Sequence, residues 1–204
     1  MSRPLNWFFT DIDQMKLFLG ILFDTDTHNE LLQMLINSSS SYIENYCDRR
    51  LKSTAYDKDV AGDKERTWFD GDNSKRLFLR EYPVTAVSAV EVSGATISAA
   101  ESTDYYGSTG YLLYEDRGEL FYDSGWDVGK KNVRVSYTAG YTEDSRQLLD
   151  LRELCQGLVA WTFNNREHLG FKSERLLNYS YTRADIREKW QKETLERYKR
   201  KVIR

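Results

Sequence analysis

Cysteine, histidine and proline are scarce in this 204-residue sequence, with two of each. Cys47 and Cys155 lie far apart and lack CxxC spacing, which excludes a disulfide framework and argues against a zinc site. Each lies in an apolar helical pattern, so we expect two buried thiols in a reducing compartment. His28 and His168 have no nucleophile or metal ligand nearby in the sequence, so structural roles are expected for both.

Long apolar runs and nucleotide-binding loops are also missing. No run approaches the roughly 20 residues that span a bilayer, and the first residues lack the apolar core of a signal peptide. We therefore expect synthesis in the cytoplasm and no membrane partner. Neither a P-loop nor a GxGxxG pattern after a strand occurs. Since no set of acid, base and nucleophile can be assembled, we expect no enzyme activity, no metal and no cofactor.

Charge is unevenly distributed along the chain. The net charge is -3 and the pI is about 5.6, so the chain as a whole is no basic nucleic-acid binder. Bases nevertheless outnumber acids from residue 183 to the end, and residues 197–204 carry bases without any acid. Such asymmetry indicates a surface with a dedicated partner at that end.

Both ends of the sequence read as helical. Thr10 and Asp11 can cap a first helix, and Thr27 to Glu30 fits a capping box that starts a second helix reaching about Cys47. Ser145 can cap a third helix, followed by a loop over residues 164–178. Residues 183–202 predict a final charged helix whose narrow apolar stripe indicates weak packing or an absent partner.

The middle of the chain, from about residue 53 to 141, has the short alternating runs and turn residues of antiparallel strands. Its last run, NVRVSYTAGY, alternates apolar and polar residues and then stops at Gly140, which we interpret as the exit turn. The predicted strands are Thr67–Phe69, Arg76–Arg80, Ala86–Val92, Tyr111–Tyr114, Glu119–Tyr122 and Asn132–Thr138, with a further one near Thr96–Ile97.

These patterns predict an α+β fold, a small helical bundle with an inserted antiparallel β-rich element and a C-terminal helical tail. We expect bundle helices over residues 1–52, the β-rich insertion over 53–141, and a bundle helix with a docking loop and helix over 142–204.

Several stretches, in this order, resemble the head-tail connector (adaptor) proteins of tailed bacteriophages and prophages. They are the helix TDIDQMKLFLGI, the helix end SYIENYCDRRL, the strand pair LREYPVTAVSAVEV, and GELFYDSGW followed by NVRVSYTAGY and a helix. The resemblance covers roughly residues 10 to 165.

The resemblance implies a structural virion protein at the head-tail interface. Such adaptors form a ring, commonly of twelve copies, below the portal, and they extend the DNA channel without sequence-specific binding. The ring is a platform for a stopper, head-completion or tail protein. The C-terminal segments of adaptors are regarded as docking elements against the portal.

We accordingly predict portal docking by aromatic, apolar and basic residues that lie in segments with weak helical or strand pattern. They are Trp190, Arg197, Tyr198, Arg200 and Lys201 of the final helix, and Phe171, Leu176, Leu177, Tyr179 and Tyr181 of the preceding loop. The alternative is a nucleic-acid-binding module that uses the basic C-terminal helix.

Overall fold

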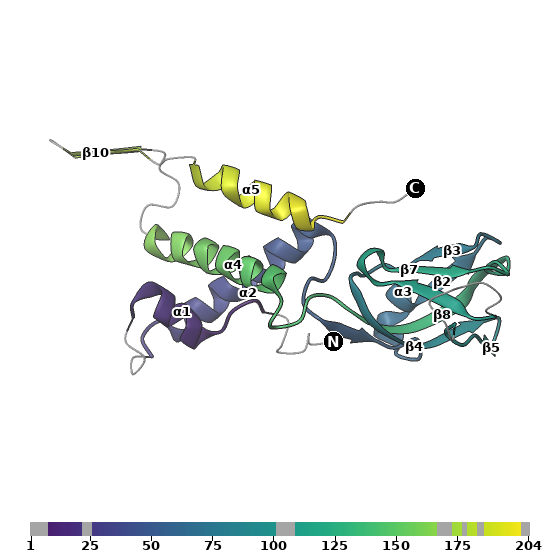
Figure 1. The fold of residues 1–204 in the computed structure, drawn as a ribbon. Helices are drawn as coiled ribbons and strands as arrows, with labels where there is room; N and C mark the ends of the chain where they lie inside the picture. Colours follow the sequence, from purple (N-terminus) through teal and green to yellow (C-terminus); the bar gives the residue numbers. More distant parts are fainter. Residues whose placement is uncertain are drawn as a thin grey trace. The chain divides into compact units, whose positions relative to one another are not determined.

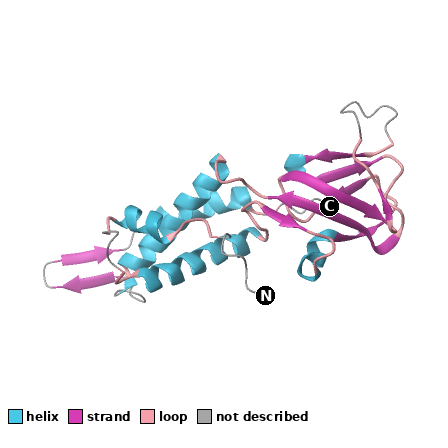
Figure 2. Cartoon of the chain, turned by 90° about the horizontal axis from the view of Figure 1, so that it is seen from below, coloured by secondary structure: helices cyan, strands magenta, loops and turns pink. Residues whose placement is uncertain are grey.

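The chain folds into two compact units (Figure 1). The computed structural model describes residues 8–21, 26–100, 109–166, 173–176, 179–182 and 186–200, with the backbone alone for 173–176, 179–182 and 186–190. The first unit joins Met1–Arg49 to Asp144–Arg204, and the second is Arg50–Glu143. Helices dominate the first unit and antiparallel strands the second, which confirms the predicted α+β class (Figure 2).

The first unit is built from four described helices and one two-stranded sheet. These elements are α1 (Ile12–Leu19), α2 (Asn29–Cys47), α4 (Arg146–Asn164), β9 (Ser173–Leu176), β10 (Tyr179–Thr182) and α5 (Ile186–Tyr198).

All three helices begin near the predicted residues, and two of the three predicted caps are confirmed. The Asp11 carboxylate accepts the N–H of Gln14 at 2.7 Å, and the Ser145 hydroxyl accepts the N–H of Leu148 at 3.2 Å. The capping box of α2 does not form, because His28 is its N-cap residue and no side chain caps the helix. The His28 ring instead packs edge-on against Phe163, with 5.2 Å between ring centroids.

A serine of α2 lies against α4. Ser40 is fully buried, and its hydroxyl lies 3.6 Å from the Cys155 thiol while accepting the N–H of Phe9 at 3.5 Å. A side chain this small lets the two helices approach closely. Cys47 and Cys155 are both free and fully buried, as predicted, and burial raises the pKa of each thiol to about 11.

The second unit contains eight described strands in two sheets. They are β1 (Thr54–Tyr56), β2 (Trp68–Gly71), β3 (Arg76–Phe78), β4 (Val84–Val92), β5 (Ala95–Thr96), β6 (Tyr111–Tyr114), β7 (Glu119–Tyr122) and β8 (Gly129–Ala139). Short helical turns accompany them, namely η1 (Ala61–Asp63), α3 (Lys64–Thr67) and η2 (Glu115–Arg117).

Strand β8 is the centre of the larger sheet. Val133 pairs with Val92 of β4 on one side and with Phe69 of β2 on the other. Six residues later, Ala139 pairs with β4 again and with β1 on the opposite side. The sheet order is therefore β1-β8-β4-β5, with β2 sharing the β1 side of β8, while β3, β7 and β6 form the second sheet.

The two sheets of this unit share one hydrophobic core, which is the reason for the alternation seen in β8. Val133, Val135 and Tyr137 are at most 1% exposed and pack with Leu120 of the other sheet and with the fully buried Trp126. Burial of apolar side chains from both sheets stabilises each sheet against the other.

Gly140 ends β8 as the sequence predicts. Its φ of +110° lies in a region that side-chain-bearing residues avoid, and a Cβ there would lie 2.6 Å from the carbonyl carbon of Lys52. The neighbouring Tyr141 N–H donates to the Leu51 carbonyl at 2.7 Å. Strand β8 thus ends where it packs against Leu51 and Lys52, the residues with which the chain enters the second unit.

Candidate docking site

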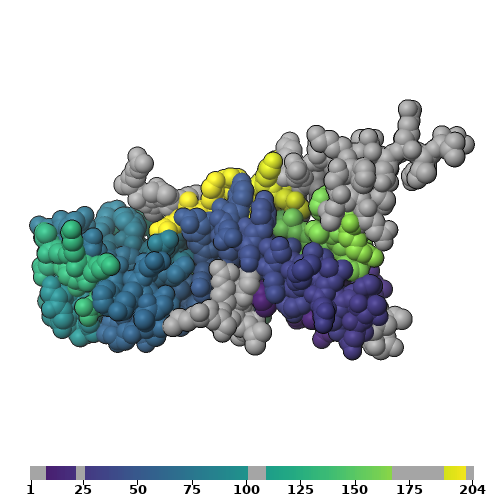
Figure 3. Space-filling view, turned by 180° about the vertical axis from the view of Figure 1, so that it is seen from behind, coloured from purple at the N-terminus to yellow at the C-terminus, as the bar shows by residue number. Residues whose placement is uncertain are grey.

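The C-terminal end of α5 is fastened to the C-terminal end of α2. The Arg49 guanidinium donates from Nε to the Tyr198 carbonyl at 2.7 Å, and the Arg200 N–H donates to the Cys47 carbonyl at 2.8 Å. These bonds satisfy carbonyls that each helix end leaves without an intrahelical partner. Figure 3 shows α5 in yellow against the blue surface that includes α2. The end of α5 is therefore held in a defined position on the helical unit.

Tyr198, which the sequence analysis places among the portal-docking residues, is a buried core residue of this unit. Its side chain is 6% exposed, and its hydroxyl donates to the Asp150 carboxylate on α4 at 3.0 Å. Leu195, one turn earlier, is 1% exposed. The narrow apolar stripe of the sequence thus suffices to seat this end of α5, because α2 and α4 surround it.

The basic residues at the C-terminal end of α5 differ in their exposure and in their acidic neighbours. Arg197 is exposed, in the last turn of α5. The Lys199 ammonium lies 3.5 Å from the Glu196 carboxylate and 5.2 Å from the centre of the Tyr46 ring. The Arg200 guanidinium lies 4.0 Å from the Asp48 carboxylate.

Glu196 is held in its charged form by its neighbours. Its carboxylate accepts the Tyr46 hydroxyl at 2.6 Å, and this bond lowers the pKa of Glu196 and raises the pKa of Tyr46. Tyr46 thus links α2 to the same turn of α5 that pairs with Lys199. The negative charge of Glu196 therefore offsets the nearby positive charge of Lys199.

The predicted loop before α5 contains a β-hairpin, which corrects the interpretation of residues 164–178 as loop throughout. Tyr179 pairs with Leu176, and Tyr181 pairs with Glu174. Leu176, Tyr179 and Tyr181 are therefore strand residues, while Trp190 lies within α5. Phe171, Leu177, Lys201 and His168 lie outside the described residues.

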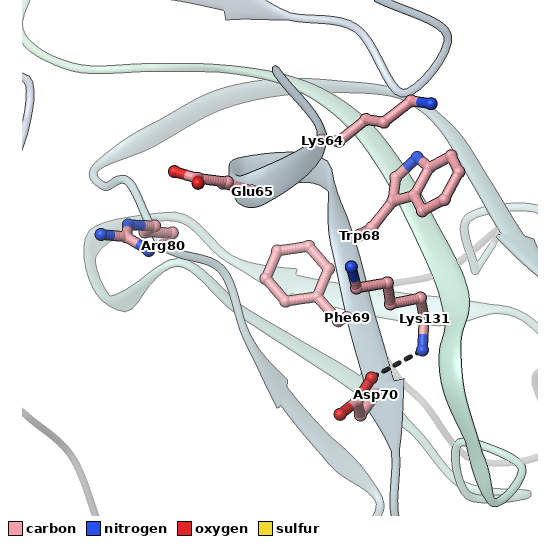
Figure 4. Close-up of a pocket in the computed structure, with 7 residues that line it drawn as sticks. All are labelled: Lys64, Glu65, Trp68, Phe69, Asp70, Arg80 and Lys131. Carbon is pink, nitrogen blue, oxygen red and sulfur yellow. Dashed lines mark hydrogen bonds between the residues drawn. The ribbon is translucent and has the colours of Figure 1, made fainter. Parts of the chain in front are cut away.

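A pocket in the second unit, which the sequence did not predict, is called here the β2 pocket. It has a volume of about 770 Å³ and lies beside β2 (Figure 4). Its lining residues come from α3, β2, β8 and the segment after β3, and they are Lys64, Glu65, Trp68, Phe69, Asp70, Arg80 and Lys131.

Cations hold the Trp68 ring of the β2 pocket in place. The Lys64 ammonium lies 4.6 Å and the Arg134 guanidinium 4.3 Å from the ring centre, both within cation–π range. The indole N–H of Trp68 donates to the Lys58 carbonyl at 2.9 Å. The ring is therefore a fixed, partly exposed aromatic surface.

The acidic residues Asp70 and Asp72, at the end of β2 and in the turn that follows it, bind backbone amides. The Asp70 carboxylate accepts the N–H of Lys131 at 2.6 Å, and the Asp72 carboxylate accepts the N–H of Ser74 at 2.9 Å. The bonds from Ser74 also lower the pKa of Asp72. Both acids therefore serve the turn between β2 and β3 and its contact with β8.

The model of one protein family, described as head completion protein, matches residues 8–168 of this chain. The chain belongs to the head completion protein family. This head completion protein is accordingly a head-tail connector, a structural component of a phage virion at the head-tail interface. Its role is thus one of assembly, as the resemblance implied.

The fold of this head completion protein also occurs in a solved assembly. The likeness is to a chain of a structure described as "Neck of empty GTA particle computed with C6 symmetry", with a TM-score of 0.55 and 15% identity. The alignment covers 100% of this chain and 95% of that chain. No curated protein matches the sequence. Among the described residues, no helix is long and apolar enough to cross a membrane.

Sequence patterns offered only a partial signal for the β2 pocket of this head completion protein. Lys64 precedes Trp68 by four residues, which is a spacing visible in the sequence. Lys131 and Arg134 are more than sixty residues away, and only the pairing of β2 with β8 brings them to the site. Strand pairing over such a distance has no local signature.

Proposed function

We propose that copies of this protein form a ring below the portal, which extends the DNA channel and carries the stopper or tail protein. The fixed end of α5 is the observation that supports portal docking by the C-terminal segment. Because Arg49 and Arg200 fasten that end to α2, the chain has a defined position on this unit as far as Arg200. A charged segment that leaves from a fixed point loses less freedom on binding than one on a mobile tether.

We expect the portal to be met by exposed basic residues near this end and by the aromatic and apolar residues that precede it. Arg197 is exposed and contributes a positive charge at the point where the chain leaves α5. We expect Arg197 and Lys201 to contact acidic portal residues, with Trp190, Phe171, Leu176, Leu177, Tyr179 and Tyr181 adding apolar area. The Tyr198 side chain is buried. The Arg200 backbone N–H bonds to α2, and we expect the Arg200 guanidinium to contact the portal with Arg197 and Lys201.

Co-purification with the portal protein encoded in the same genome tests this proposal. Imaging of the complex is expected to show a second ring stacked below the portal, and its subunits can be counted there. Arg197→Glu is expected to weaken binding at least about tenfold, since a like charge then faces the acidic partner. Lys192→Glu changes the same charge at an exposed position earlier in α5 and is the matched control.

Two results would overturn the proposal. One is no second ring with a well-folded portal. The other is equal loss of binding for the two variants, which would indicate a general charge effect. If the free protein instead binds DNA with a steep dependence on salt, and loses that binding with Arg197→Glu, the nucleic-acid-binding alternative is the better account.

A further inference from the structure

The β2 pocket lies beside β2, an edge strand of the larger sheet, where the chain continues to β3, an edge strand of the smaller sheet. Strand β2 pairs with β8 and strand β3 with β7, and among the described strands each has one edge without a partner. Only residues 72–75 join them, so β2 and β3 diverge from a short turn into different sheets. Lys64 and Arg80 stand at the open end of this divergence, before β2 and after β3. An edge strand presents unpaired backbone groups to which another strand can bind.

The pocket offers an added strand both an apolar floor and positive charge. Phe69 is partly buried against the hydrophobic core, and Figure 4 shows its ring on the side of β2 that faces Arg80. Lys64, Arg80 and Lys131 contribute three cations against the acids Glu65 and Asp70. The figure also shows the Lys131 side chain extending from its Asp70 contact toward Trp68 and Phe69.

The β9–β10 hairpin also has strand edges without partners among the described strands. Its two strands pair with each other and with no other described strand, so both outer edges are open. A two-stranded hairpin alone is marginally stable in water. Tyr179 and Tyr181 occupy alternate positions of β10 and therefore share one face, on which their cross-strand partners are Leu176 and Glu174.

We propose that the β9–β10 hairpin of one copy binds in the β2 pocket of a neighbouring copy. The hairpin adds main-chain hydrogen bonds to an open edge, its tyrosines pack on Trp68 and Phe69, and Glu174 lies among the pocket cations. The contact joins two different surfaces, so it can continue from copy to copy around a ring. In this respect it rests on the proposed ring, and it assigns the residues that close that ring.

Photo-cross-linking with mixed isotopes tests the contact in the full chain. Benzoylphenylalanine replaces Tyr181, and equal amounts of ¹⁴N-labelled and ¹⁵N-labelled protein are irradiated, both free and on the portal. Mass spectrometry is expected to find position 181 joined to residues 64–70 or 131 in pairs of mixed isotope. Lys64→Glu with Lys131→Glu is expected to reduce these pairs about tenfold, because both new carboxylates repel Glu174.

Two controls keep the result specific. The exposed Lys75→Glu lies outside the pocket and is expected to leave the yield unchanged. Benzoylphenylalanine in place of the exposed Tyr42 on α2 is expected to give no pocket product.

Each other outcome overturns the inference. Products of a single isotope would place the hairpin on its own chain, and products outside the pocket would assign it another partner. If the ring forms on the portal without any pocket product, the contact is absent while the proposed function stands. If the portal binds no copies, the proposed function fails, and the free protein still decides the contact by the presence or absence of mixed pairs.

Discussion

At the scale of single residues, Tyr198 connects three helices through its backbone carbonyl and its side-chain hydroxyl. It lies at the end of α5, its carbonyl accepts from Arg49 after α2, and its hydroxyl donates to Asp150 of α4. Tyr198→Phe removes only the hydroxyl and is expected to lower the free energy of unfolding by about 1 kcal/mol. Tyr198→Ala also leaves a cavity and is expected to cost about 3 kcal/mol or more. Denaturant unfolding measures both values.

The control for Tyr198 is its neighbour in sequence. Arg197→Ala removes an exposed side chain and is expected to change stability by less than about 0.5 kcal/mol. A Tyr198→Ala variant as stable as this control would show that the tyrosine is not part of the core.

At the scale of elements, Gly140 in the turn after β8 has a positive φ and lies against the backbone of Lys52. Gly140→Ala is expected to destabilise the chain by about 3 kcal/mol or more, because its Cβ would meet the Lys52 backbone while φ stays positive. Gly94→Ala has a positive φ with nothing within 4 Å, so it is expected to cost about 1 to 2 kcal/mol. Thermal unfolding of both variants separates strain from clash, and equal losses would contradict the role of Lys52.

Elements with strong periodicity could be predicted from the sequence. The alternating residues of β8 predict a strand because one of its faces is buried. The capping residues of α1 and α4 predict where these helices begin, because each cap side chain accepts a hydrogen bond from a backbone amide of the first turn. Strands β6 and β7 begin and end at the predicted residues.

Elements that depend on distant partners could not be predicted in this way. Strand β1 has three residues, too few for a period, and forms because β8 offers it an edge. The hairpin β9–β10 was interpreted as loop for the same reason of length. The burial of Tyr198 depends on α2 and α4 meeting around α5, which no pattern within α5 discloses.

At the scale of the whole molecule, the two thiols make the stability of the first unit depend on pH. Burial raises the pKa of Cys47 and Cys155 to about 11 from an ordinary value of 9.0, so the folded state holds both protons more tightly. The stabilisation is complete below pH 9 and is lost as the pH rises toward 11. Urea unfolding followed by helical circular dichroism is expected to show a lower midpoint at pH 10.5 than at pH 8.

Replacing both thiols gives the control for this pH effect. Cys47→Ala with Cys155→Ala is expected to lower stability at pH 8 and to flatten its decline above pH 9, because no buried thiol remains to ionise. An unchanged decline in the double variant would assign the effect to other groups, such as the buried Tyr137, whose pKa burial also raises.

The division of the chain also sets an order of events during synthesis. The second unit is one continuous segment, Arg50–Glu143, and it can close once β8 has left the ribosome. The first unit combines segments from before and after the second unit in the sequence. Helices α1 and α2 are therefore synthesised first and lack their partner α4 until the second unit has been synthesised. Since the contacts between α2 and α4 span more than a hundred residues, as between Ser40 and Cys155, their formation is the late step. The contacts of α5 with α2 and α4 therefore form only after α5 has been made.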